Sequence, residues 1–460
     1  MIVAVALDLG TTNIKAGLLA QDGSLRNIAS LPAPRIAIDG GRYESDALAY
    51  AEAADAVLAG CLVQTEARPS LGICSQRSSF LIWESTSGTP VTPLISWQDD
   101  RGAEICVALH GQESTIRELS GLPLTPYYLA PKLLVLLREH PAWRERMHSG
   151  EWLLGTLDTF LIWRWTGGRQ HVTDVSMAAR ALLMDIHTRQ WSPALCGLFD
   201  IPQQALPQIV PSTGLGLRLD NGLTLQASMG DQSAALLASI VIGRREALVN
   251  LGTGGFVVCY LPEGRSAPKG YLQTLVWQDA ARQVHLACEG TLNSIAAALA
   301  VYPVGACRVE ALASDEIFCL AEPSGLGAPY FRGDLGVTFS EPIENLPVQR
   351  IALLLQEGII FRVVRILEDF QREFGIERVY LSGGLSNLPC LQQGIARCVP
   401  LDVFHLSQTD ASLLGAAQLA ADGVALEPEK SERIRVTLRS TELLMKYQLW
   451  KKWLDGLLQQ

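Results

Sequence analysis

Several common functional motifs are missing from this chain of 460 residues. It contains neither a C-x-x-C pair nor H-E-x-x-H, so a zinc ribbon, a dithiol redox site and a zincin-type metal site are not indicated. No G-x-x-x-x-G-K-[ST] P-loop occurs, and no G-x-G-x-x-G follows the first apolar run. The sequence therefore argues against a P-loop NTPase and against a dinucleotide-dependent dehydrogenase.

Positive charge and long apolar runs are also scarce. Charged residues make up 18% of the chain, and the net charge is −10, so we expect neither nucleic acid nor a membrane surface as the main partner. No stretch of about 18 uncharged apolar residues predicts a membrane span. The ten cysteines are scattered singly, and the N-terminus lacks the basic and small-residue segments of a signal peptide. These features predict a cytoplasmic α/β protein.

What the chain does have is hydrophobic residues, at 48%, and a length that predicts two or three domains. Val3–Leu7 and Ile14–Leu19 predict two strands joined by a turn of glycine and hydroxyl residues. The same arrangement recurs with an offset of 242 residues, which places Asp8 on Asn250 and the Gly10 turn on the Gly252 turn. The pattern therefore predicts that the second half of the chain repeats the first.

A glycine turn between strands exposes backbone N–H groups that suit phosphate oxygens. The hydroxyls of Thr11 and Thr12 would add donors, and Lys15 a positive charge. An ordinary hairpin with a solvated lysine explains either turn by itself. Two such turns, one at the head of each half, favour a pair of phosphate loops.

Two acidic residues have candidate roles beside such a site. Asp8 ends the first apolar run, and a carboxylate near phosphate is tolerated when Mg²⁺ lies between them. Asp231 precedes an Ala/Leu-rich helix, where it serves either as an N-cap or as the base that takes a proton from an acceptor hydroxyl. Asp8 likewise has a simpler explanation as a turn cap.

Later in the chain, apolar residues at steps of three or four from Leu355 to Phe374 predict a long amphipathic helix that Gly375 ends. A strand, the Gly383-Gly384 turn and a further helix follow, a place where ligand can approach the backbone closely.

Together these segments resemble the FGGY carbohydrate kinases of the actin-like ATPase superfold, and their wording is closest to the glycerol kinases. LDLGTTNIKAGL and NLGTGGF are similar to the two phosphate motifs of the family. GICSQRSSFLIWE and ISWQDDRGAE resemble its sugar-site segments, MGDQSAALLAS its catalytic-base segment, and LSGGLSNLPCLQQGIA its adenosine motif. The resemblance extends over nearly the whole chain.

The resemblance implies an α/β fold with two ribonuclease-H-like domains, each a mixed sheet flanked by helices, around a central cleft. Residues 1–243 would carry the sugar side, the first phosphate loop and the base. Residues 244–460 would carry the second phosphate loop and the adenosine side. It also implies ATP and Mg²⁺ as cofactors and a small sugar or polyol as acceptor, and it leaves a homodimer open.

Site residues follow by matching motifs. Asp231 is the implied base, and Asp8 and Asp231 are the implied metal-side acids. The residues implied to bind the nucleotide are Gly10, Thr11, Thr12, Asn13, Lys15, Gly252, Thr253, Gly254, Gly255, Gly383, Gly384 and Asn387. The residues implied to bind the acceptor are Arg77, Ser78, Trp97, Tyr127, Asp231, Gln232 and Phe256.

One position departs from the glycerol kinase pattern. The Arg-Glu pair of that pocket is Arg77-Ser78 here, so a carboxylate that would accept hydrogen bonds from substrate hydroxyls is missing. The departure weakens the case for glycerol itself. Two other classes of function stay open: a nucleotide-binding switch of the actin or chaperone type, and a regulatory relative that binds a sugar without turnover.

Overall fold

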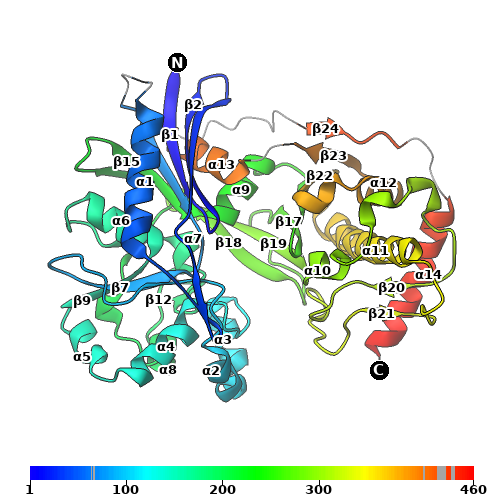
Figure 1. Cartoon of the computed structure of the whole chain (residues 1–460), viewed down its shortest axis with the longest axis horizontal. Helices are drawn as coiled ribbons and strands as arrows, with labels where there is room; N and C mark the ends of the chain where they lie inside the picture. The colour runs from blue at the N-terminus through cyan, green and yellow to red at the C-terminus, as the bar shows by residue number, and fades with distance from the viewer. Residues whose placement is uncertain (64, 66–67, 408–409, 422–430, 437–440, 460) are drawn as a thin grey trace. The chain divides into compact units, whose positions relative to one another are not determined.

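The computed structural model describes residues 1–63, 65, 68–407, 410–421, 431–436 and 441–459 (Figure 1). The chain forms two compact units. The first comprises Met1–Ala238, Leu275–His285 and Asp410–Leu426, and the second comprises Ser239–Thr274, Leu286–Thr409 and Glu427–Gln460. The units thus differ from a single division at residue 243, because two later segments return to the first unit.

The first unit is built on a mixed six-stranded sheet in the order β14-β15-β6-β1-β2-β3. Its strands are β1 (Ile2–Leu9), β2 (Asn13–Ala20), β3 (Leu25–Pro32), β6 (Ser70–Ser75), β14 (Thr213–Arg218) and β15 (Thr224–Gly230). β1, β2 and β3 pair antiparallel, whereas β6 pairs parallel to both β1 and β15. The two strands expected at the N-terminus are confirmed.

Helices cover both faces of this sheet, which explains why β1 is a continuous apolar run. Val5, Leu7 and Leu9 point to the face covered by α1 (Ala47–Leu62) and α6 (Leu157–Trp165). Ala4 and Ala6 point to the opposite face, which is covered by α9 (Asp231–Ser239) and α13 (Ala411–Ala420) (Figure 1). Side chains alternate along a strand, so Asp8 belongs to the α9 and α13 face.

Small residues allow those two helices to approach closely. A Cβ on Gly72 of β6 would lie 2.1 Å from the Ala416 carbonyl oxygen, and a Cβ on Gly415 would lie 1.9 Å from that of Ala234. The helix α13 therefore belongs to the first unit although it comes late in the chain. The segment Leu275–His285 joins the same unit through Gln278, whose backbone N–H donates to the Ser212 hydroxyl.

A five-stranded sheet in the order β4-β5-β8-β7-β9 completes the first unit with its helices. Its strands are β4 (Ala37–Asp39), β5 (Arg42–Ser45), β7 (Phe80–Glu84), β8 (Leu94–Ile95) and β9 (Trp152–Thr156). The helices are α2 (Ala103–Ala108), η1 (His110–Gln112), α3 (Glu113–Ser120), α4 (Leu129–Glu139), α5 (Trp143–His148), α7 (Val175–Ala178), α8 (Pro193–Leu198) and η2 (Gln203–Ala205). Short strand pairs are formed by β10 (Val172–Asp174) with β13 (Gln208–Val210), and by β11 (Met184–Asp185) with β12 (Gln190–Trp191).

The second unit repeats the strand order of the first. The seven-stranded sheet runs β18-β19-β17-β16-β22-β23-β24, and its strands β18 and β19 lie partly in the segment Leu275–His285 of the first unit. The strands are β16 (Glu246–Leu251), β17 (Gly255–Tyr260), β18 (Leu272–Gln278), β19 (Val284–Leu292), β22 (Arg378–Ser382), β23 (Asp402–Leu406) and β24 (Ser431–Arg433). β16, β17 and β19 pair antiparallel, and β22 pairs parallel to β16 and β23, as β1, β2, β3, β6 and β15 do. The internal repeat inferred from the glycine turns is therefore present in the topology.

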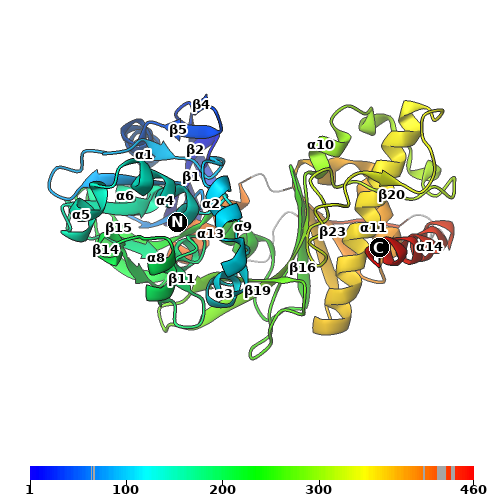
Figure 2. The ribbon, with the colours of Figure 1, turned by 90° about the horizontal axis from the view of Figure 1, so that it is seen from below.

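Helices cover one face of the second sheet, where Ala247, Val249 and Leu251 of β16 are buried. The expected long helix is α11 (Val348–Phe374), and it ends at Gly375 in the left-handed region with φ 66°. α14 (Thr441–Leu458) lies beside it (Figure 2). The remaining elements are α10 (Ile295–Leu299), η3 (Val304–Ala306), η4 (Val309–Ala311), β20 (Cys319–Leu320), β21 (Thr338–Phe339), η5 (Gly384–Asn387) and α12 (Pro389–Cys398).

Two units with this shared order confirm the expected α/β class with paired ribonuclease-H-like sheets. Among the residues that the structure describes, none of the helices combines the length and the apolar character that crossing a membrane requires.

Candidate functional site

The first glycine turn joins β1 to β2 at Gly10. A Cβ at this position would lie 2.7 Å from the backbone oxygen of Asn13, so the turn closes only around glycine. Thr12 and Asn13 are exposed, while Thr11 is half-buried. The turn thus presents backbone N–H groups and the Thr12 hydroxyl to solvent, which is the arrangement that an anion-binding loop requires.

Asp8 lies at the end of β1, directly opposite Lys15 on β2. Its Oδ2 accepts a 2.6 Å hydrogen bond from the Ser412 hydroxyl at the start of α13. Its Oδ1 is buried and has no hydrogen-bond partner among the described residues. Burial, aided by the nearby charge of Asp231, raises the pKa of Asp8 to about 6.

Lys15 is engaged within the first unit. Its Nζ lies 2.7 Å from Oδ1 of Asp410, the residue that precedes α13. The lysine side chain is 32% exposed, so its ammonium group also faces solvent. Lys15 therefore links β2, next to the Gly10 turn, to the residue that precedes α13.

Asp231 is the first residue of α9, immediately after β15 ends at Gly230. Its Oδ1 accepts a 2.7 Å hydrogen bond from the backbone N–H of Gln232 and lies 3.8 Å from Nε of Arg77. Burial raises the pKa of Asp231, and the positive charge of Arg77 opposes that rise. A carboxylate with a raised pKa is a stronger base than a free one and is suited to accept a proton in its ionised form.

Arg77 is held in place from both sides. It is 5% exposed, and its Nη2 donates to the side-chain oxygen of Gln232. A Cβ on Gly230 would lie 2.6 Å from Cδ of Arg77, so the glycine leaves room for the arginine stem. Asp231, Gln232 and Arg77, three of the predicted acceptor-side residues, are thus in contact.

Ser78 adopts a left-handed backbone conformation with φ 64°. Its side chain is buried, and its hydroxyl donates a 3.0 Å hydrogen bond to the backbone oxygen of Arg180. The Ser78 proton is therefore used within the protein. The residue next to Arg77 adds no carboxylate for a substrate hydroxyl.

Trp97 and Tyr127 form an aromatic pair next to these polar groups. Their ring centroids are 5.5 Å apart with an interplanar angle of 54°. Burial raises the pKa of Tyr127, and the positive charges of Arg77 and Arg180 oppose that rise. The tyrosine therefore lies near both guanidinium groups. The first unit therefore brings the predicted acceptor-side residues together, apart from Phe256, which lies on β17 of the second unit.

The second unit brings its two glycine turns together. A Cβ on Gly383, whose φ is 87°, would lie 2.4 Å from the Leu251 carbonyl oxygen at the end of β16. The Gly252 N–H donates to the Gly254 carbonyl, and the surroundings of Gly384 are open. The remaining predicted residues of these turns are Thr253 and Asn387, which are exposed, and Gly255, which is packed against Leu292 and Ile295.

Several residues that hold this site were not predicted from the sequence. Ser412 of α13 and Asp410, which precedes that helix, come hundreds of positions after their partners Asp8 and Lys15. Buried Lys132 of α4 donates to the backbone oxygens of Ser96 and Trp97 at 3.0 and 3.3 Å. No spacing in the sequence signals such pairs, because each joins elements that only the tertiary fold brings together.

The residues at the first turn fit a divalent cation. The charge of Asp231 helps to raise the pKa of Asp8, and Oδ1 of Asp8 is buried without a partner among the described residues. A cation between phosphate and these acids would relieve both effects. Among the described residues no group of three or more His, Cys, Asp and Glu side chains could hold a metal ion, so the remaining ligands would be phosphate oxygens and water.

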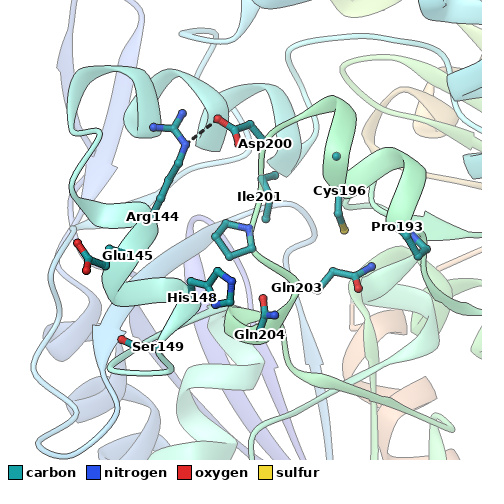
Figure 3. A pocket seen from close by; sticks show the side chains of 12 residues that line it. Arg144, Glu145, His148, Ser149, Pro193, Cys196, Asp200, Ile201, Gln203 and Gln204 are labelled. Carbon is teal, nitrogen blue, oxygen red and sulfur yellow. Dashed lines mark ion pairs between the residues drawn. The ribbon is translucent and has the colours of Figure 1, made fainter.

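A hollow of about 760 Å³ between α5 and α8 lies elsewhere on the first unit (Figure 3). Arg144 and Asp200 form an ion pair across one side of it at 2.7 Å. None of the predicted site residues lines this hollow. The predicted site residues thus lie apart from this hollow.

Comparison with known proteins matches both halves of the chain to one family. Residues 3–227 match the N-terminal domain, and residues 247–423 the C-terminal domain, of the FGGY family of carbohydrate kinases. A glycerol kinase of Thermus brockianus is 34% identical over 90% of this chain and 88% of that protein. One from Alkalilimnicola ehrlichii is 31% identical over 92% of this chain and 90% of that protein.

Solved structures show the same fold. A glycerol kinase of Plasmodium falciparum, solved with ADP, superimposes with a TM-score of 0.87 at 22% identity and covers 99% of this chain and 98% of its own. A xylulose kinase of Rhodospirillum rubrum superimposes with a TM-score of 0.82 at 18% identity and covers 99% and 100%. From the family match and the curated relatives, the chain belongs to the FGGY family of carbohydrate kinases and is an ATP-dependent kinase that acts on a hydroxyl group of a sugar or polyol.

Proposed function

We propose that Asp231 is the general base of the phosphoryl transfer. It would accept the proton of the acceptor hydroxyl as that oxygen attacks the γ-phosphorus of ATP, and ADP would leave. Support comes from its place at the start of α9, its raised pKa and its contact with Arg77. Arg77 would keep the carboxylate ionised and would also orient the acceptor.

The backbone N–H groups of the Gly10 turn and those of the Gly252 turn would each bind nucleotide phosphate oxygens. Mg²⁺ would be held by Asp8 and Asp231 together with phosphate oxygens, and it would neutralise charge on the phosphates. The buried Oδ1 of Asp8, which has no hydrogen-bond partner among the described residues, supports this assignment. The open turn at Gly384 and the exposed Asn387 would bind the adenosine.

Glycerol is the first acceptor to test, because the relatives at 31–34% identity are glycerol kinases. The acceptor would be bound by Arg77, Asp231 and the faces of Trp97 and Tyr127. Ser78 would leave one hydroxyl of glycerol without its carboxylate partner, so a different small polyol or sugar is the second candidate.

The ten cysteines are all free thiols. Unpaired and mostly buried thiols fit a reducing compartment, which supports the proposal that the protein works in the cytosol.

Release of ADP across a panel of polyols, aldoses and ketoses tests the activity and identifies the acceptor. We expect release that depends on at least one acceptor. Replacing Asp231→Asn should lower kcat by about 10²–10⁴-fold, the range for a general base, while ATP binding stays within about twofold. Asp220→Asn, at an exposed ion pair with Arg169, is the matched control and should behave as wild type.

Two results would contradict the proposal. Unchanged turnover in Asp231→Asn would exclude this residue as the base. ATP binding without acceptor-dependent ADP release over the whole panel would instead favour the regulatory relative that binds its ligands without turnover.

A further inference from the structure

The indole N–H of Trp97 forms a hydrogen bond with the turn at Gly10 that joins β1 to β2. Its Nε1 donates to the Thr11 hydroxyl oxygen at 3.0 Å. Thr11 comes from the turn between β1 and β2, whereas Trp97 follows β8 in the other sheet of the same unit. A residue expected to bind phosphate is thus in direct contact with a residue expected to bind the acceptor.

The direction of the hydrogen bonds shows how the Thr11 hydroxyl is used. It accepts from Trp97, so its single proton is the one that it donates to Oε1 of Gln76 at 3.3 Å. The Gln76 amide is oriented at its other end, where Nε2 donates to the Tyr50 hydroxyl at 3.1 Å. Tyr50 in turn donates to the carbonyl of Gly10 at 3.3 Å. These hydrogen bonds therefore form a continuous chain that starts at the Trp97 indole and ends at the Gly10 carbonyl.

A second chain of hydrogen bonds fixes the backbone of Trp97. Its N–H donates to the Ser79 hydroxyl at 3.0 Å, and Ser79 donates to the same Gln76 oxygen at 2.9 Å. The Trp97 carbonyl accepts from Lys132. The indole and the backbone N–H of Trp97 thus donate to the hydroxyls of Thr11 and Ser79, which both donate to Gln76. Its carbonyl is held by the buried Lys132.

A phosphate oxygen accepts hydrogen bonds and has no proton to give. The Thr11 hydroxyl cannot donate to it while its proton is shared with Gln76. We propose that the Thr11 hydroxyl positions the indole of Trp97 for binding of the acceptor. In this role the Thr11 hydroxyl does not bind the nucleotide. The backbone N–H of Thr11 and the exposed hydroxyl of Thr12 remain for phosphate. This inference rests on the proposed role of Trp97 in acceptor binding.

Thr11→Val tests the proposal because valine keeps the shape and the backbone N–H but has no hydroxyl. The indole N–H then has no acceptor, and we expect the KM for the acceptor to rise about tenfold. The KM for ATP should stay within about twofold of wild type. Thr11→Ser should restore the acceptor KM, since it returns the hydroxyl.

Thr12→Val is the matched control in the same turn, and it should raise the KM for ATP while the acceptor KM is unchanged. The opposite pattern, with Thr11→Val raising only the KM for ATP, would overturn the proposal. Absence of acceptor-dependent ADP release by the wild type would instead overturn the proposed function, so the two failures are distinct.

The hydrogen bond itself is tested without turnover. In a ¹H–¹⁵N spectrum of the full chain, the Trp97 indole signal is assigned by its loss in Trp97→Phe. We expect this signal to shift and to exchange faster with solvent in Thr11→Val but not in Thr12→Val. An unchanged Trp97 signal in a folded Thr11→Val protein would overturn the positioning role.

Discussion

Replacement of Asp8 by asparagine should make the unliganded protein more stable and the enzyme less active. Asp8 ends a buried strand, and its Oδ1 has no partner among the described residues. Burial raises its pKa from 3.8 to about 6, so the charged form is disfavoured in the fold. Asparagine keeps an oxygen that can accept from Ser412 but has no charge to bury.

The size of the effect follows from this pKa. Between pH 3.8 and about 6 the folded protein holds a proton on Asp8 that the unfolded chain has released, so stability falls as pH rises through this range. Above pH 6 the cost is complete. At 1.36 kcal/mol for each pH unit of difference, it amounts to about 3 kcal/mol. Asp8→Asn should recover up to this amount at pH 7.5 and almost none below pH 4.

Urea unfolding with a chelator and without nucleotide, at pH 4 and at pH 7.5, measures this difference. Asp22→Asn is the control, because the pKa of this exposed carboxyl is lowered by its bonds to Ser24 rather than raised, so no stabilisation is expected at pH 7.5. A gain that is equal at both pH values, or no gain at pH 7.5, would refute the account of Asp8.

The same variant has a kinetic signature. With the proposed Mg²⁺ ligand removed, turnover should fall and its dependence on Mg²⁺ concentration should shift to higher values. A variant that is more stable yet less active would identify Asp8 as a residue kept for function at a cost in stability. An unaltered Mg²⁺ dependence would remove Asp8 from the metal site.

Two further substitutions test the acceptor side. Gly230→Ala places a Cβ 2.6 Å from Cδ of Arg77 and should raise the acceptor KM about tenfold by displacing the guanidinium. Gly111→Ala is the control: none of the described residues lies within 4 Å of its Cβ, so steady-state kinetics should be unchanged. Ser78→Glu places a carboxylate beside Arg77 and should raise kcat/KM for glycerol about tenfold relative to other acceptors. Ser78→Ala is the control, because it only removes the hydrogen bond to the Arg180 carbonyl and should not change this preference. An acceptor KM that is unchanged in the first variant, or an acceptor preference that is unchanged in the second, would contradict the assigned roles.

Much of the fold was readable from local patterns. The apolar run that ends at Asp8, the recurrence of its glycine turn at Gly252 and the helix that ends at Gly375 each predicted an element that the structure contains. These signals are local, because strand burial and the tight turns depend on residues a few positions apart. The roles of the named site residues came from the family resemblance and stay predictions.

Other features depended on contacts across long sequence separations. The helix α13 returns to the first sheet, where Ser412 contacts Asp8 and the preceding Asp410 contacts Lys15. Trp97 likewise donates to Thr11. No periodicity in the sequence relates the residues of these pairs. By itself the sequence determined which turns are free of side chains and where acids follow buried strands, since those properties belong to neighbouring residues. Only the tertiary structure decided which hydroxyl protons are already used, because a hydrogen-bond partner is set by distance in space and not along the chain.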